Sequence, residues 1–127
     1  MPERNDFAET FLKLREIFKP YVRKLVVVHD TETNYYLDTN YVMKNKHRLF
    51  FGGVRVGKAY VSFHLMPVYA SPDLLERMSP ELKKHMQGKS CFNFKKVDEK
   101  LFKELSGLTN AGFVKFNDPK FLEKITR

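Results

Sequence analysis

The feature that most constrains this chain is an aromatic-rich block, Leu49–Tyr69, which the pair Val56-Gly57 divides into two halves. β-Branched and aromatic residues favour strands, and a glycine between two such runs favours a tight turn. The block therefore predicts a β-hairpin at the centre of the fold. With a two-residue turn at Val56-Gly57, the facing pairs are Arg55 with Lys58, Val54 with Ala59, Gly52 with Val61 and Phe50 with Phe63.

Alternation along the two strands separates an apolar core face from a mixed face. The core face carries Phe50, Gly52, Val54, Ala59, Val61, Phe63 and Leu65. The mixed face carries Leu49, Phe51, Gly53, Arg55, Lys58, Tyr60, Ser62 and His64. In this register the ring of Tyr60 covers Gly53, and His64 lies opposite Leu49.

Helices are expected near both ends of the chain. Apolar residues spaced by three and four over Phe7–Leu25 are typical of an amphipathic helix, which Pro20 ends or kinks. Asp98 has the character of an N-cap, and the apolar residues after it predict a helix to about residue 114. A last short helix is expected around residues 121–125.

Two short helices are predicted between the hairpin and the last strand. Ser71-Pro72 and Ser79-Pro80 each combine an N-cap residue with a proline at the first helical position. We expect the second of these helices to close near Gly88, because glycine commonly follows a helix C-terminus.

Three further short strands are expected beside the hairpin. Leu25–Val28 is an apolar, mostly β-branched run suited to a buried strand, and Tyr35–Asp38 and Cys91–Phe94 also favour strands. The chain, residues 1–127, is therefore predicted to be one α+β domain. An antiparallel sheet around the 49–66 hairpin would be packed by the N-terminal helix and the helix that begins at residue 98.

The formal net charge is +8, and basic residues concentrate in two windows. Residues 40–60 hold five basic residues and no acidic one, and residues 83–103 hold seven lysines against two acids. Such windows attract anionic partners, while lysines on exposed turns also serve solubility. The sequence predicts a small non-enzymatic binding or accessory module for a small anionic ligand or a protein partner. The residues expected to contact the ligand are Arg55, Lys58, Tyr60, His64, Lys89, Lys95 and Lys96.

Tyr60 and His64 are expected to line a shallow pocket beside Gly52-Gly53, because glycines in a strand let a ligand approach the backbone. The alternative for His64 is a half-buried side chain with one hydrogen bond. Lysines on both sides of Cys91, the one cysteine, could lower the pKa of its thiol, but because no base is identifiable an inert, buried or half-buried thiol is predicted. No base, phosphate loop, serine elbow or dinucleotide motif is recognisable, so no catalytic residue or cofactor is predicted and an enzymatic role stays open.

Two other groups of residues suggest different kinds of site. His29-Asp30 with Glu32 resembles a set of metal ligands, but a polar turn after a strand accounts for the same residues and no metal site is predicted. Phe92 and Phe94 with flanking lysines suit single-stranded nucleic acid, while two aromatics spaced by two on a strand also suit a core. Nucleic-acid binding is therefore an alternative function.

Three segments together resemble the YdhG-like family of small domains of unknown function. They are Leu49–Gly53, Tyr60–Tyr69 and Gly88–Phe94, the last with a Gly-Lys pair before a short Phe-containing strand. The resemblance covers roughly residues 10–115. Some members are described as frataxin-like iron chaperones, so the resemblance implies that role as a further alternative. Iron would be held by carboxylates, which are densest in the first 39 residues, at Glu3, Asp6, Glu9, Glu16, Asp30, Glu32 and Asp38.

The cellular location is inferred from two negative features. The first residues are polar where a signal peptide has a basic start and an apolar run. The longest uncharged stretch, Ala59–Pro72, is too short and too polar to span a bilayer. A cytoplasmic protein without membrane contact is expected, and the sequence leaves its oligomeric state open.

Overall fold

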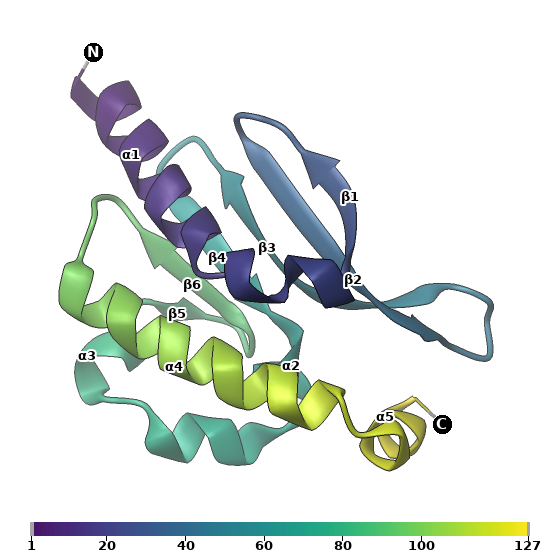
Figure 1. Cartoon of the computed structure of the whole chain (residues 1–127). Helices are drawn as coiled ribbons and strands as arrows, with labels where there is room; N and C mark the ends of the chain where they lie inside the picture. The colour runs from purple at the N-terminus through teal and green to yellow at the C-terminus, as the bar shows by residue number, and fades with distance from the viewer. Residues whose placement is uncertain (1, 127) are drawn as a thin grey trace.

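The computed structural model describes residues 2–126 and confirms the predicted α+β fold (Figure 1). The helical elements are α1 (Pro2–Glu16), η1 (Lys19–Lys24), α2 (Met66–Ala70), η2 (Pro72–Arg77), α3 (Pro80–Lys83), α4 (Glu99–Phe116) and α5 (Pro119–Ile125), where η marks a 3-10 helix. The strands are β1 (Val26–Asp30), β2 (Asn34–Val42), β3 (Arg48–Val56), β4 (Val61–Leu65), β5 (Met86–Gln87) and β6 (Cys91–Phe94).

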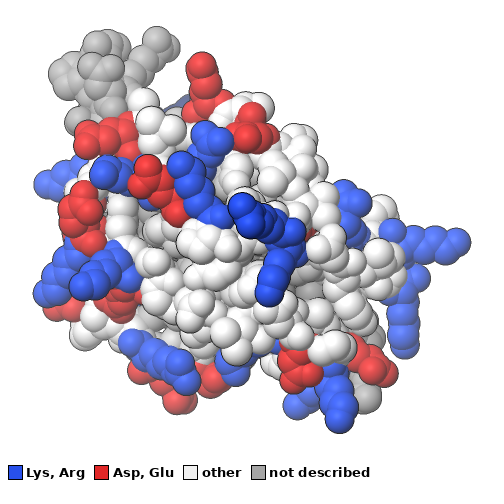
Figure 2. All heavy atoms as spheres, viewed as in Figure 1, with Lys and Arg blue, Asp and Glu red and all other residues white. Residues whose placement is uncertain are grey.

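Within the described residues the strands form one six-stranded sheet in the spatial order β1-β2-β3-β4-β6-β5. Every neighbouring pair is antiparallel. Helices α1 and α4 lie across one face of the sheet, the face turned toward the viewer in Figure 1. In the same view, Figure 2 shows Lys and Arg side chains mostly around the margin of this face and a broad central area without charge.

Stacked and edge-on aromatic rings hold the helices to the sheet. Phe18, just after α1, stacks on Phe63 of β4 with ring centroids 4.9 Å apart and meets Phe51 of β3 edge-on at 6.0 Å. Beneath α4, Phe94 of β6 meets the ring of Phe102 edge-on at 4.9 Å. All five rings are buried, and each removes a large apolar area from water, so they fix both helices in place.

The predicted hairpin exists, but its predicted register is wrong. β3 and β4 pair with Val56 opposite Val61, so Gly57–Tyr60 form a four-residue connection in place of a two-residue turn. A hydrogen bond from the Gly57 N–H to the Tyr60 carbonyl oxygen, at 2.8 Å, closes this connection. Consequently Tyr60 does not cover Gly53, and His64 lies opposite Gly53 in place of Leu49.

A β-bulge reverses the predicted faces of β3 from Phe51 back to Leu49, which is buried in the core although it was predicted on the mixed face. Leu37 pairs with Gly52 and Asp38 pairs with Phe50, so Phe51 is an extra residue in the ladder. Phe51 therefore points into the core and is fully buried, whereas Phe50, predicted to be a core residue, is only half-buried on the opposite face. The sequence pattern alone does not contain this insertion, because it depends on how β2 pairs.

The run Leu25–Val28 was predicted to be a buried strand, and the structure corrects this. The strand β1 begins at Val26 and lies at one edge of the sheet, where it pairs with β2 alone. Val27 and Val28 remain 43% and 38% exposed. The second expected strand, Tyr35–Asp38, forms but extends on both sides as β2.

Local helix signals were mostly interpreted correctly. α1 ends before Pro20, which lies within η1. The Ser79 hydroxyl accepts a hydrogen bond from the Leu82 N–H at 3.2 Å, and the Asp98 carboxylate accepts one from the Leu101 N–H at 3.1 Å, so both residues cap helices as predicted.

Two details of the short helices differ from the predictions. Ser71 does not cap through its side chain, because its hydroxyl donates a hydrogen bond to the Asp73 carboxylate. α3 ends at Lys83, well before Gly88, because the chain then enters β5 to pair with β6. Among residues 2–126 no helix combines the length and apolar character that crossing a membrane requires.

Candidate functional site

The sheet face opposite α1 and α4, here called the open face, carries two rows of residues that cross the strands in register. The first row is His29, Tyr36, Gly53, His64, Cys91 and Gln87. The second row is Asn34, Arg55, Ser62 and Asn93. Because paired residues on adjacent strands project to the same side, the sheet gathers residues from distant parts of the chain.

Gly53 leaves a gap in the first row, between Tyr36 and His64. The gap belongs to a hollow of about 370 Å³, here called the open-face hollow, which is lined by His29, Asn34, Tyr35, Tyr36, Phe50, Gly53, Val54, Arg55 and His64. A Cβ atom at position 53 would lie 2.5 Å from the Tyr35 carbonyl oxygen, so this backbone accepts only glycine without a shift. The missing side chain thus permits the close strand packing that lines the hollow.

Aromatic rings form one wall of the open-face hollow. Tyr36 and Phe50 lie with ring centroids 4.7 Å apart in a tilted arrangement, and the ring of His29 meets Tyr36 edge-on at 5.8 Å. Burial, reinforced by the negative charge of Asp38, raises the pKa of Tyr36, so its phenol keeps its proton near neutral pH. This wall can therefore offer apolar contact together with a hydroxyl donor.

The charge in the open-face hollow is entirely basic. Arg55 lines it, no Asp or Glu does, and Arg55 forms no ion pair with a carboxylate of the part of the chain that the structure describes. Burial lowers the pKa of His64, and the adjacent Arg55 charge lowers it further. At neutral pH, His64 is therefore an uncharged imidazole with one N–H donor, beside a permanent guanidinium cation.

A chain of hydrogen bonds fixes the side chains next to the hollow. The Ser62 hydroxyl donates to Asn93 Oδ1 at 2.8 Å, and Asn93 Nδ2 donates to Gln87 Oε1 at 2.7 Å. The Tyr60 hydroxyl donates to the same Gln87 oxygen at 3.1 Å. This chain ties β4, β6 and β5 together on the open face, so the polar side chains there are held rather than free to rotate.

Cys91 lies beside His64, which sequence reasoning did not anticipate. Its Sγ is 3.9 Å from His64 Nε2 and donates a hydrogen bond to Asn93 Oδ1 at 3.4 Å. Burial raises the pKa of the half-buried Cys91 thiol, which agrees with the predicted inert thiol and not with a thiolate. A protonated thiol beside a neutral imidazole is not the thiolate–imidazolium pair that a cysteine nucleophile uses.

The seven residues predicted to contact a ligand fall into separate places. Arg55 and His64 line the open-face hollow. Tyr60, Lys95 and Lys96 line a different depression of about 350 Å³ with His85, Asn93, Phe94 and Asp98. Lys58 is exposed in the connection after β3, and Lys89, in the connection between β5 and β6, lies 5.8 Å from the ring centroid of Tyr69.

Sequence reasoning missed His29, Asn34, Tyr36 and Phe50 as hollow-lining residues. Only Tyr36 could have been found from the sequence. Side chains alternate along the predicted strand Tyr35–Asp38, so Tyr36 points to the face opposite its buried neighbours Tyr35 and Leu37. His29 and Phe50 could not be assigned, because bulges in β1 and β3 decide which face they occupy.

Neither alternative site is assembled among the side chains that the structure describes, which do not include Glu3 and Asp6 of the iron alternative. His29 lies on the open face, whereas the next residue, Asp30, pairs with Arg15 of α1 at 2.9 Å. The described part of the chain contains no group of three or more His, Cys, Asp or Glu side chains placed to hold a metal ion. Phe92 and Phe94 are fully buried, so neither ring is free to stack on a nucleic-acid base.

Comparisons with protein-family models, curated proteins and solved structures found no match to this chain. The YdhG-like resemblance therefore stays a prediction, and the function is argued from the site alone.

Proposed function

We propose that this chain is a small cytoplasmic binding module, YdhG-like in its architecture and non-enzymatic, whose open-face hollow holds a small oxyanion. The observation that carries the proposal is Arg55, whose guanidinium lines a cavity to which no described carboxylate contributes. Arginine in such a position suits phosphate or carboxylate, because its planar donors match two oxygens of either group.

The other polar groups of the hollow support the same ligand class. The neutral His64 imidazole, the Asn34 amide and the protonated Tyr36 hydroxyl each offer a hydrogen-bond donor. Gly53 lines the same hollow and carries no side chain that would compete with an anion for these donors. A ligand with a carboxylate or phosphate group and a small planar body would also contact the rings of Tyr36 and Phe50.

The electrostatics favour binding over nucleophilic chemistry. The nearest nucleophile candidate, Cys91, has a raised pKa and a neutral histidine beside it. Activation would require the proton to leave the thiol, which burial opposes. The arrangement thus supplies donors that recognise an anion but no group prepared to attack it.

The test is a titration of the ¹⁵N-labelled protein with inorganic phosphate and, separately, acetate at low ionic strength, followed by backbone amide shifts. Saturable shifts are expected at Tyr36, Gly53 and His64. Arg55→Gln should weaken binding about tenfold. Lys58→Gln removes a nearby exposed charge that does not line the hollow and should change the affinity less than twofold.

Two outcomes would contradict the proposal. One is the absence of saturable shifts around Gly53 with either anion, and the other is equal weakening by Arg55→Gln and Lys58→Gln, which would indicate diffuse electrostatic attraction. The same titration with ferrous iron and with a single-stranded oligonucleotide tests the two alternative functions. A nucleic-acid binder would lose affinity steeply as salt rises.

A further inference from the structure

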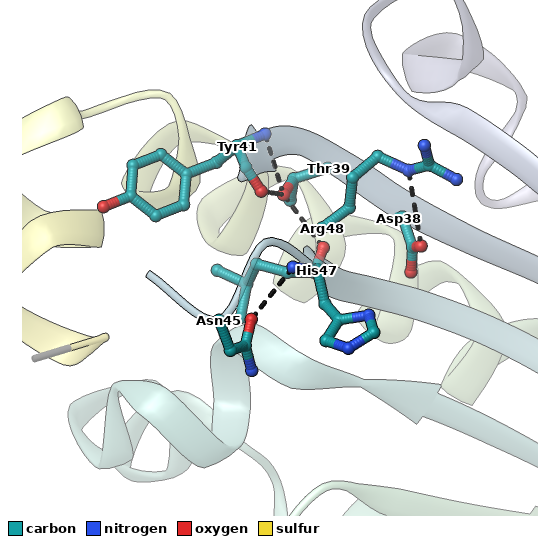
Figure 3. A network of polar contacts seen from close by, with 7 residues as sticks. Asp38, Thr39, Tyr41, Asn45, His47 and Arg48 are labelled. Atoms are coloured by element: carbon teal, nitrogen blue, oxygen red, sulfur yellow. Dashed lines mark hydrogen bonds and ion pairs between the residues drawn. The ribbon is translucent and has the colours of Figure 1, made fainter. Parts of the chain in front are cut away.

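The segment at residues 39–41 interrupts the pairing of β2 with β3. The regular register is lost between Asp38 and Val42. The hydroxyl of Thr39 compensates, because Oγ1 donates to the Leu49 carbonyl oxygen at 2.9 Å and accepts from the Tyr41 N–H at 3.2 Å (Figure 3). Bulges of this kind bend a strand and redirect its side chains, and they are common beside binding sites.

The irregular segment, residues 39–41, forms one wall of a groove. This groove lies on a different part of the surface from the open-face hollow. This groove, of about 420 Å³, is here called the basic groove, and its size is within the range of small-molecule sites. It is lined by Arg23, Lys24, Leu25, Thr39, Asn40, Tyr41, Phe51, Phe113, Phe116, Asn117, Pro119 and Leu122. No residue lines both cavities.

The interior of the basic groove is apolar and largely aromatic. Phe51, Phe116 and Leu122 are buried, and the ring of Phe51 meets those of Phe113 and Phe116 edge-on, each at 5.9 Å between centroids. The half-buried Tyr41 adds a further ring. Such an interior suits a flat apolar body rather than a compact, strongly hydrated ion.

Two hydrogen bonds brace the walls of the basic groove. Asn40 Nδ2 donates to the Lys24 carbonyl oxygen at 2.8 Å, which ties β2 to η1. The hydroxyls of Tyr41 and Thr126 lie 3.3 Å apart within hydrogen-bond reach, which ties β2 to the end of α5. A groove whose walls are already joined loses little conformational entropy when a ligand enters.

The rim of the basic groove carries positive charge without an opposing charge. Arg23 and Lys24 both line it, no Asp or Glu does, and neither basic residue forms an ion pair with a described carboxylate. Figure 2 shows Lys and Arg side chains at the position of η1, beside the uncharged central area. The rim and the interior are thus complementary to the two ends of an amphipathic anion.

We propose that the basic groove binds a small amphipathic carboxylate, with its aromatic or aliphatic body on Phe113 and Tyr41 and its carboxylate between Arg23 and Lys24. This site is separate from the open-face hollow and does not depend on the function proposed for that hollow. The guanidinium of Arg23 suits a carboxylate because it donates two parallel hydrogen bonds.

The experiment uses 2-naphthoate as the probe and the ¹⁵N-labelled full chain as the target. Saturable amide shifts are expected at residues 39–41 and 113–117. Arg23→Gln combined with Lys24→Gln should weaken binding about tenfold. The matched control, Lys19→Gln with Lys120→Gln, removes the same charge from η1 and α5 outside the groove and should leave the affinity within twofold.

A second probe separates charge recognition from simple apolar binding. The neutral amide 2-naphthamide has nearly the same shape as 2-naphthoate and should bind about tenfold more weakly. Equal affinity for the two probes, equal weakening by the two double variants, or no saturable shift at residues 39–41 would each overturn the proposal. Shifts centred instead on Tyr36 and Gly53 would assign the probe to the open-face hollow and also overturn it.

Discussion

The two halves of the sheet differ in regularity. From β3 through β4 to β6 neither ladder shifts its register, and each paired residue has one partner on each neighbouring strand. From β1 through β2 to β3 the register shifts three times, after Val27, Leu37 and Asp38. Both proposed binding sites lie against the irregular half, where bulges redirect side chains of β1, β2 and β3 toward the two cavities.

The largest effect tests whether the regular half carries the stability. Phe63→Ala removes a fully buried ring that contacts Phe18 and Phe92, and should lower the free energy of unfolding by about 3–5 kcal/mol. Phe50→Ala, on the open face of the irregular half, should cost about 1 kcal/mol because that ring is only partly buried. Urea unfolding measures the free energy of unfolding of each variant. Similar losses in the two variants would contradict the view that the regular half of the sheet contributes more stability.

A smaller loss in the free energy of unfolding is expected at Gly53, where the backbone packing requires glycine. Gly53→Ala places a Cβ against the Tyr35 carbonyl oxygen and should cost about 1–3 kcal/mol, while also reducing phosphate binding. Gly107→Ala is the matched control, because it lies within α4 with no atom within 4 Å of the added carbon. There the change should stabilise the chain by about 0.5–1 kcal/mol. The unfolding midpoint in urea should fall for Gly53→Ala and rise for Gly107→Ala. A change of the same sign in both variants would contradict the predicted clash between the added Cβ and the Tyr35 carbonyl oxygen.

The Thr39 hydroxyl takes the place of hydrogen bonds between β2 and β3, whereas the Thr109 hydroxyl adds one bond within α4. Loss of the Thr39 hydroxyl should therefore lower the free energy of unfolding more than loss of the Thr109 hydroxyl. Thr39→Val leaves the Leu49 carbonyl and the Tyr41 N–H without that partner and should cost about 1–3 kcal/mol. Thr109→Val removes a bond to the Leu105 carbonyl, which already lies within the hydrogen-bonded α4, and should cost less than about 1 kcal/mol. Thermal or urea unfolding of the pair gives the comparison. A larger loss for Thr109→Val would be inconsistent with a bracing role for Thr39.

The smallest effect concerns pH. His64 has a folded-state pKa below its ordinary value of 6.5, so the unfolded chain takes up the proton at higher pH than the folded chain does. The wild type should therefore lose stability as pH falls below about 6.5, and His64→Gln should reduce that loss. Unfolding at pH 7.5 and pH 5.5 measures the difference between the two chains. An unchanged pH dependence in His64→Gln would show that burial of His64 is too slight to matter.

The predictable parts of the fold are those set by short stretches of sequence. The caps at Ser79 and Asp98 and the break near Pro20 depend on neighbouring residues, and all three were predicted. The hairpin was also predicted, because Val56-Gly57 interrupts two strand-forming runs. Its register was not, because the hydrogen bond from Gly57 to Tyr60 selects a longer connection.

The candidate site was less predictable because it depends on pairing between distant segments. Arg55 and His64 were named as ligand contacts from the alternation of one hairpin, and they line one cavity. Phe50 joins them only because the insertion of Phe51 turns its ring to the open face, and His29 joins through β1. Such placements follow from strand order, which the sequence pattern did not contain.

The position of Cys91 gives the chain an internal reporter. The chain has one cysteine, and the thiol lies in the same row as His64 and one strand further from Gly53. Because burial raises its pKa, alkylation should be slow at neutral pH and faster in mildly alkaline buffer. An environment-sensitive fluorophore attached there would be the single label on the molecule, and its emission would report when the neighbouring hollow is occupied.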